Sequence, residues 1–178
     1  HDDSAEKRHD ILSVHQINNA ISNNLFILYK QDIVALQQED SGKHFEILLR
    51  MKNSHGKIVK PASFLPTAER YHLTSKIDCW VINAVSEHFL EHKSQLVGID
   101  KITINLSEHS LTDNKLEKFI IEKLSNGHLP SEKICFEITA TAAIANEART
   151  HLFIKNISAL GCKFALDDVG RDYLTHKH

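Results

Sequence analysis

The amino-acid sequence predicts an α/β fold built on a largely parallel β-sheet. Five short apolar segments, rich in β-branched and aromatic residues, have the length and composition of β-strands. Between them lie stretches whose apolar residues recur at helical spacing. Such stretches supply the crossover of about a dozen residues or more that parallel neighbours require. The pattern alone does not decide between an open sheet and a barrel.

Each element is placed by its own local pattern. The strands are expected at 25–34, 45–51, 101–107, 133–139 and 163–168. An opening helix, roughly Ala5 to Ser22, precedes the first strand, and Pro61 begins a short helix over 61–72 after the second. The remaining helices are expected over 77–85, 116–124 and 143–160.

Composition and charge exclude several classes of protein. The 178 residues are 42% apolar and 25% charged, which suits one globular domain with a real core. The net charge of -2 provides no diffuse basic field, which argues against duplex nucleic acid or direct membrane contact. No apolar stretch approaches the ~18 residues of a membrane span. Three widely spaced cysteines in apolar surroundings favour a reduced, cytoplasmic location, with any membrane tether supplied by other domains.

Apolar strands are interrupted or ended by four polar residues: Glu46, Asn105, Glu137 and Asp167. The last two spacings, 32 and 30 residues, each equal one strand plus its crossover helix. Because a parallel sheet brings successive strand ends to one edge, we expect these side chains to meet. A hard divalent cation would relieve the repulsion, since carboxylate and amide oxygens suit Mg²⁺, Mn²⁺ or Ca²⁺. Asp168 can reach a second ion, and paired metals are common in phosphoester hydrolysis.

A structural interpretation competes with the metal site. A single aspartate at a strand end is commonly a helix cap, and Asn105 with Ser107 could cap the helix after the third strand. Glu137 is harder to explain in this way, because a carboxylate inside an apolar strand is rarely left without a partner. Spacing alone does not decide between a metal site and scattered caps.

Five motifs, in order, resemble the EAL domains of bacterial cyclic-di-GMP signalling. FEILLR (45–50) is similar to the signature E-A-L-x-R, and KPASFLPTAERYHL (60–73) is similar to the P-x-x-F-I-P-x-A-E stretch. NLS (105–107), EIT (137–139) and DDVG (167–170, for D-D-F-G) follow. The resemblance implies a TIM-type (β/α) barrel of the EAL type, with an antiparallel first strand and a ligand site at the carboxyl ends of the strands.

The resemblance also implies roles for individual residues, with Mg²⁺ or Mn²⁺ as the cofactor. The positions that bind one metal in this family correspond to Glu46, Asn105, Glu137 and Asp167. The second metal's ligand corresponds to Asp168, and Gln31 and Arg50 match positions that contact the dinucleotide. A planar guanidinium suits that role, because it pairs with phosphate oxygens or a guanine edge. No catalytic residue is assigned, because the family's general-base lysine would lie beyond residue 178.

The chain departs from the family in several places. Asp32 replaces the proline of Q-P-I, Ala140 replaces the second glutamate of E-x-T-E, and GRDYLT (170–175) stands where G-T-G-Y-S-S is usual. About five of the eight strands of such a barrel are present. We therefore expect a linker helix over 1–22 and an incomplete EAL-like domain over 23–178. We also expect this chain to be part of a longer protein that carries a GGDEF or sensor domain.

These features predict a phosphodiesterase that hydrolyses cyclic di-GMP to linear pGpG by a two-metal mechanism. The alternative is a catalytically inactive EAL-like receptor or protein-interaction module, which Asp32, Ala140 and the altered loop favour. Cyclic di-GMP is the expected ligand, with a homodimer and a GGDEF or sensor domain as further candidate partners. The 178-residue segment alone is expected to lack turnover, because the family's remaining active-site groups would follow it.

Overall fold

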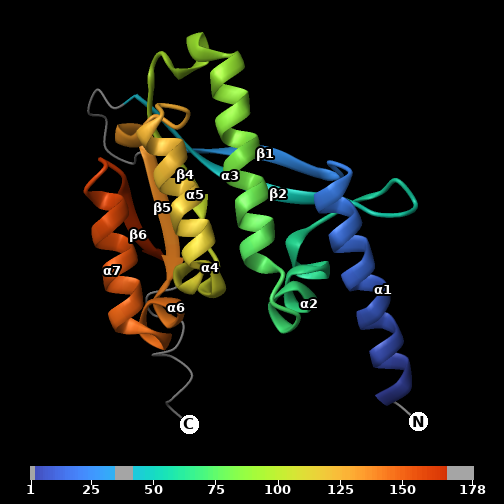
Figure 1. The fold of residues 1–178 in the computed structure, drawn as a ribbon. Coiled ribbons are helices and arrows are strands. Elements are labelled where there is room, and N and C mark those ends of the chain that lie inside the picture. The colour runs from blue at the N-terminus through green and yellow to red at the C-terminus, as the bar shows by residue number, and fades with distance from the viewer. Residues whose placement is uncertain (1–2, 35–41, 168–178) are drawn as a thin grey trace.

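The computed structural model describes residues 3–34 and 42–167, and strands alternate with helices over most of its length (Figure 1). The strands are β1 (Phe26–Ile33), β2 (Lys43–Lys52), β3 (Ile58–Val59), β4 (Ile99–Asn105), β5 (Ile134–Thr139) and β6 (Lys163–Asp167). The α-helices are α1 (Asp3–Ser22), α2 (Leu65–Arg70), α3 (Thr74–Glu91), α4 (Glu108–Thr112), α5 (Asn114–Ser125), α6 (Ala140–Ala145) and α7 (Glu147–Ser158). Short 3₁₀ turns occupy Pro61–Ser63, Lys93–Leu96 and Ser131–Lys133.

One sheet joins the described strands in the order β1-β2-β4-β5-β6, with β3 beside β2. β1 runs antiparallel to β2, whereas β2, β4, β5 and β6 are parallel neighbours. Both features match the sequence prediction. The two-residue strand β3, which was not predicted, pairs with the end of β2 across a tight turn.

All five predicted strands are confirmed, while two helices differ from their predicted form. The helix expected over 61–72 is a 3₁₀ turn followed by α2, which begins with Pro66 in its first turn. The helix expected over 143–160 is divided into α6 and α7 at Asn146. The Asn146 side chain accepts a hydrogen bond from the Arg149 N–H at 3.4 Å, so it ends one helix and caps the next. The short helix α4 was not predicted.

The opening helix α1 is confirmed, and its last turns belong to the core. Ile17 and Ala20 are completely buried, and α1 contacts α2 and α3. The assignment of residues 1–22 to a linker stays a prediction. None of the helices within residues 3–34 and 42–167 combines the length and apolar character needed to cross a membrane.

Helices α3, α5 and α7 lie side by side over one face of β4, β5 and β6 (Figure 1). The side chains that join these two layers are almost completely buried: Ile82, Ile102, Ile104, Ile120, Phe136 and Phe153. Because successive strand side chains point to opposite faces, Thr103, Asn105 and Glu137 belong to the other face of the sheet. Burial of the apolar face therefore leaves a polar face for ligands.

The junction between α3 and α5 is held by a single carboxylate. Asp113 is the N-cap of α5, and its side chain accepts hydrogen bonds from the backbone N–H groups of Lys115 (2.8 Å) and Leu116 (3.3 Å). Ser75 Oγ donates to the other oxygen at 2.8 Å. Burial alone would raise the pKa of Asp113, but the hydrogen bonds from Ser75, Leu116 and Lys115 outweigh it and lower the pKa. The ionised form is thus the one that stabilises the fold.

Asp113→Ala should lower the free energy of unfolding by about 0.5–2 kcal/mol near neutral pH, because α5 loses its cap. The folded-state pKa is the lower one, so the contribution is present above the unfolded pKa and is lost as pH falls through the folded pKa. Urea denaturation at about pH 7 and about pH 3 should therefore show a smaller difference at the acidic pH. Asp113→Asn keeps an oxygen that can cap the helix, so its free energy of unfolding should fall less at neutral pH than that of Asp113→Ala. A difference between wild type and Asp113→Ala that does not change with pH would contradict this role.

Candidate functional site

The four predicted strand residues lie on the same face of four neighbouring strands. Asn105 on β4 is directly opposite Glu137 on β5. Glu46 lies two residues short of the level of Asn105, and Asp167 lies two residues beyond the level of Glu137. A step of two residues keeps a side chain on its face of the sheet. The site residues thus form a diagonal row across β2, β4, β5 and β6.

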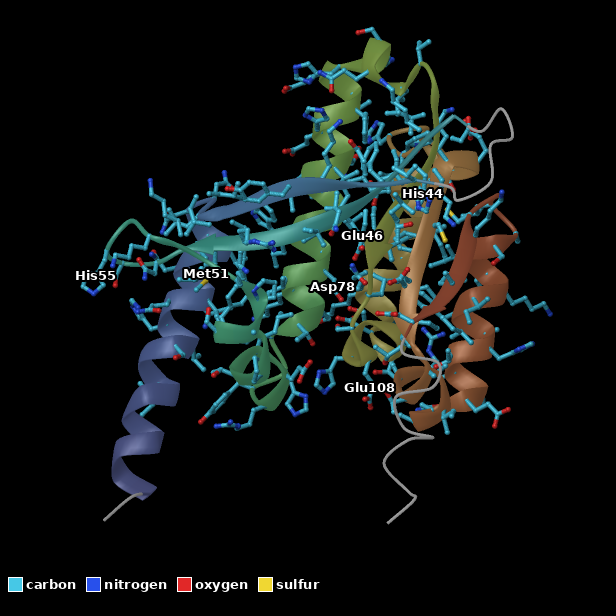
Figure 2. The ribbon with its side chains drawn as sticks, turned by 180° about the vertical axis from the view of Figure 1, so that it is seen from behind. His44, Glu46, Met51, His55, Asp78 and Glu108 are labelled. Atoms are coloured by element: carbon cyan, nitrogen blue, oxygen red, sulfur yellow. The ribbon has the colours of Figure 1, made fainter. Side chains whose placement is uncertain are left out.

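Glu46 and Asn105 are in direct contact. Asn105 Nδ2 donates a hydrogen bond to Glu46 Oε1 at 2.7 Å, joining residues that are 59 apart in the sequence. Figure 2 shows Glu46 on β2, with His44 closer to the start of the same strand. The contact uses the amide nitrogen of Asn105 and not its oxygen, which is the atom that a hard cation would bind.

His44 lies beside this pair on the same face of β2. Its Nε2 is 3.0 Å from Thr103 Oγ1, and Thr103 is buried. Burial and the charge of Lys101 lower the pKa of His44, and the opposing effect of Glu46 is smaller. The lowered pKa of His44 favours its neutral form near pH 7, so His44 is a hydrogen-bonding partner of Thr103 rather than a counter-ion for Glu46.

The side chains in the row carry the donor atoms that a metal ion needs, but they are not gathered around one point. Carboxylate and amide oxygens from Glu46, Asn105, Glu137 and Asp167 are the donors that Mg²⁺ and Mn²⁺ prefer. No three His, Cys, Asp or Glu side chains gather closely enough to hold a metal within residues 3–34 and 42–167. Asp168, the predicted ligand of a second ion, lies outside the described residues. The side chains of Glu46 and Asn105, two of the predicted ligands, are joined by a direct hydrogen bond.

Gln31 and Arg50, the predicted dinucleotide contacts, lie on the same face as Glu46. Gln31 is directly opposite Glu46 in the antiparallel pairing of β1 with β2, and it is exposed. Arg50 follows four residues later, about 13 Å along β2. Its Nη1 donates to the Leu49 carbonyl at 2.7 Å, and its guanidinium lies 5.6 Å from the centre of the Tyr29 ring. Arg50 is therefore held over an aromatic ring at the edge of the polar face.

Asp78 on α3 is a further residue of this region, and the sequence analysis missed it (Figure 2). Its Oδ2 accepts hydrogen bonds from the Ser107 backbone N–H at 2.7 Å and from Ser110 Oγ at 2.6 Å. Ser107 is the N-cap residue of α4 but makes no side-chain cap bond itself, so Asp78 supplies the cap from a different helix. Burial raises the pKa of Asp78, and the bonds from Ser110 and Ser107 oppose this. Asp78 thus fixes the turn that follows Asn105.

The helices that follow β4 and β5 are capped by residues other than the predicted ligands. Asn105 does not cap α4, because its side chain bonds Glu46 and the cap comes from Asp78. Thr139 is the residue at a strand end that does cap, since its Oγ1 accepts from the Ala142 N–H at 3.1 Å at the start of α6. The caps and the predicted ligands are therefore different residues.

A cavity of about 850 Å³ lies elsewhere, between β1, the beginning of β2 and α3. Its walls are mostly apolar and include Phe26, Phe45, Val85 and Phe89, and none of the predicted site residues lines it. The volume of a cavity is a weaker guide to chemistry than convergent polar groups. We therefore place the candidate site on the polar face of the sheet.

The chain belongs to the EAL domain family, since the sequence model of the EAL domain matches residues 14–178. It is 36% identical over 161 residues to cyclic di-GMP phosphodiesterase PdeB of Shewanella oneidensis, and the match covers 90% of this chain and 19% of PdeB. It is 28% identical to cyclic di-GMP phosphodiesterase PdeF of Escherichia coli, covering 96% of this chain and 22% of PdeF. The chain thus spans about a fifth of these relatives.

The fold agrees with solved EAL domains. The EAL domain of FimX from Pseudomonas aeruginosa, solved bound to c-di-GMP, superimposes with a TM-score of 0.75 and 28% identity. The superposition covers 92% of this chain and 67% of the FimX domain. The parallel sheet described above is therefore part of the wall of a TIM-type barrel, as the sequence predicted.

Asp78→Ala should destabilise the protein by about 1–3 kcal/mol, because the Ser107 N–H loses its acceptor. Asp78→Asn keeps one oxygen acceptor and should cost less. Glu87→Ala, at an exposed position of the same helix, is the control and should change the free energy of unfolding by less than about 0.5 kcal/mol. The three variants are compared by urea denaturation. Equal stability of Asp78→Ala and Glu87→Ala would show that Asp78 does not hold α4.

Proposed function

We propose that this chain contributes the substrate-binding and metal-binding face of a phosphodiesterase that hydrolyses cyclic di-GMP to linear pGpG. The observation that carries the proposal is the strand register, which puts Glu46, Asn105 and Glu137 on one face, with Glu46 bonded to Asn105. Membership of the EAL family supports it, as do relatives named cyclic di-GMP phosphodiesterases. The activity of the whole protein is part of the proposal.

The proposed reaction assigns a task to each strand residue. Glu46, Asn105, Glu137 and Asp167 would hold one divalent ion through their oxygens, and Asp168 would contribute to a second. When bound, the two ions would activate a water and neutralise charge on the phosphoryl group. The chain's own part is to hold these oxygens at fixed positions, which the contact between Asn105 and Glu46 and the Asp78 cap already do for two strands.

The dinucleotide would lie along β1 and β2. Gln31 lies directly opposite Glu46, and Arg50 lies about 13 Å further along β2 on the same face, so a ligand that extends from Glu46 along the strand would meet the amide first and the guanidinium further on. The Tyr29 ring, which is 45% exposed and lies beside Arg50, offers a flat apolar surface to a guanine base. Arg50 would then act as a positioning cation for the ligand.

A receptor without catalysis is the second candidate. Ala140 begins α6, three residues after Glu137, at the position where the resemblance implies a second glutamate. Asp32 is exposed and lies 3.9 Å from Lys30, where the resemblance implies proline. Both departures lie close to proposed ligands, so they favour binding without hydrolysis. A cytoplasmic location and a multidomain parent are proposed for either case.

Calorimetry with cyclic di-GMP in the presence of Mn²⁺ tests the proposal, using the protein with any flanking sequence that its gene encodes. Arg50→Ala should weaken binding by roughly 10- to 150-fold, which corresponds to about 1.5–3 kcal/mol for a charge-assisted contact. Lys118→Ala removes a positive charge from the exposed surface of α5 and is the control. Its affinity should equal that of the wild type.

Chromatography of the same mixtures separates the two candidate functions. Release of pGpG supports the phosphodiesterase, and binding without release supports the receptor. Failure of the folded wild-type protein to bind cyclic di-GMP would contradict both.

A further inference from the structure

Two histidines from separate segments meet at the end of the molecule that carries α2 and α4. His72, which follows α2, and His109, in α4, face each other with 3.0 Å between His72 Nδ1 and His109 Nε2. Their ring centres are 4.5 Å apart and the rings are steeply inclined. Glu108, the residue before His109, is labelled in the lower half of Figure 2. The pair is not among the residues assigned to the cyclic di-GMP site.

We propose that His72 and His109 chelate one divalent ion of the zinc class. Imidazole nitrogens lie about 2.0–2.1 Å from bound Zn²⁺, so two nitrogens on one ion at angles of about 90–110° are separated by about 2.9–3.4 Å. The observed separation of 3.0 Å falls within this interval. The ion takes the place of the proton that the two facing nitrogens otherwise share.

Both facing nitrogens must be unprotonated to bind an ion, and the other nitrogen of each ring can carry the N–H. Each neutral imidazole carries one N–H, and placing these on His72 Nε2 and His109 Nδ1 leaves lone pairs on the two facing nitrogens. His109 Nδ1 lies 3.1 Å from Thr74 Oγ1, which can accept its N–H. Thr74 is buried, so its hydroxyl is fixed in position. Metal-binding histidines are usually held by such an acceptor on the second nitrogen.

The backbone at His72 is unusual in a way that supports a role for its side chain. His72 has φ of 55°, in the left-handed region, just beyond the end of α2. Glycine is the usual residue at this position after a helix, because a Cβ is unfavourable there. Here the position carries an imidazole instead, and the left-handed backbone brings it against His109.

The chemistry of the pair distinguishes it from the proposed carboxylate site. Imidazole nitrogens favour Zn²⁺, Co²⁺, Ni²⁺ and Cu²⁺, whereas Mg²⁺ requires oxygen ligands. In the described part of the chain, the pair belongs to no cluster of three or more His, Cys, Asp or Glu side chains. By joining the segment after α2 to α4, the ion would brace the turn that follows Asn105.

Calorimetric titration with ZnCl₂ in excess Mg²⁺ tests the proposal on the protein with any flanking sequence its gene encodes. His72→Gly and His109→Ala should each weaken the binding of one Zn²⁺ at least tenfold. His72→Gly is the sharper variant, because glycine suits the left-handed backbone and should leave the fold intact or more stable. His55→Ala, in the turn between β2 and β3, removes an exposed histidine elsewhere and should bind as the wild type does (Figure 2).

A second measurement separates metal binding from a structural role. Zn²⁺ should raise the midpoint of thermal unfolding of the wild type and of His55→Ala, and should raise that of His72→Gly much less. Equal Zn²⁺ affinity in all four proteins, or an equal thermal shift, would overturn the proposal. No nucleotide enters the experiment, so its outcome is independent of the proposed phosphodiesterase activity.

Discussion

The alternation of side chains across parallel strands constrains where every other part of this molecule can lie. On β4, Ile102 and Ile104 are buried against the helices, whereas Thr103 and Asn105 occupy the opposite face. A shift of register by one residue would exchange the two faces, placing apolar groups in the site and a carboxylate in the core. Such a shift is strongly disfavoured, because burial of each large apolar side chain contributes about 1.5–3 kcal/mol. Packing of the helix layer therefore also fixes the row that contains Glu46, Asn105 and Glu137.

Three residues in the first turns of α3 make four polar contacts with the segment that follows Asn105. Thr74 contacts His109, Ser75 donates to Asp113, and Asp78 accepts from Ser107 and Ser110. All four contacts reach α4 or its two ends, so one helix terminus holds this segment. The helix α4 has five residues, too few to be stable alone, and depends on these contacts for its position. An ion bound by His72 and His109 would add a further link that holds α4 in place.

The sequence predicted the parts of this structure that depend on local pattern. Apolar runs located β1, β2, β4, β5 and β6, and the family motifs located the strand residues and the antiparallel first strand. The features that were missed depend on contacts between distant segments. Asp78 lies 29 residues from Ser107, and His72 lies 37 residues from His109, so no local pattern predicts either contact. The division of the last long helix at Asn146 was missed because a capping side chain overrides apolar periodicity.

We propose that a divalent ion binds the polar face of the sheet beside Asn105. Paramagnetic broadening of ¹H–¹⁵N signals by substoichiometric Mn²⁺ tests it directly, with Zn²⁺ present to occupy the histidine pair. We expect early loss of the Asn105 side-chain amide signal and of the backbone signals of Glu46 and Glu137, with Gly56 in the distant β2–β3 turn unaffected. Glu46→Gln should reduce this broadening, because a charged ligand is lost. Broadening confined to surface carboxylates, with the Asn105 signals intact, would show that no ion binds this face.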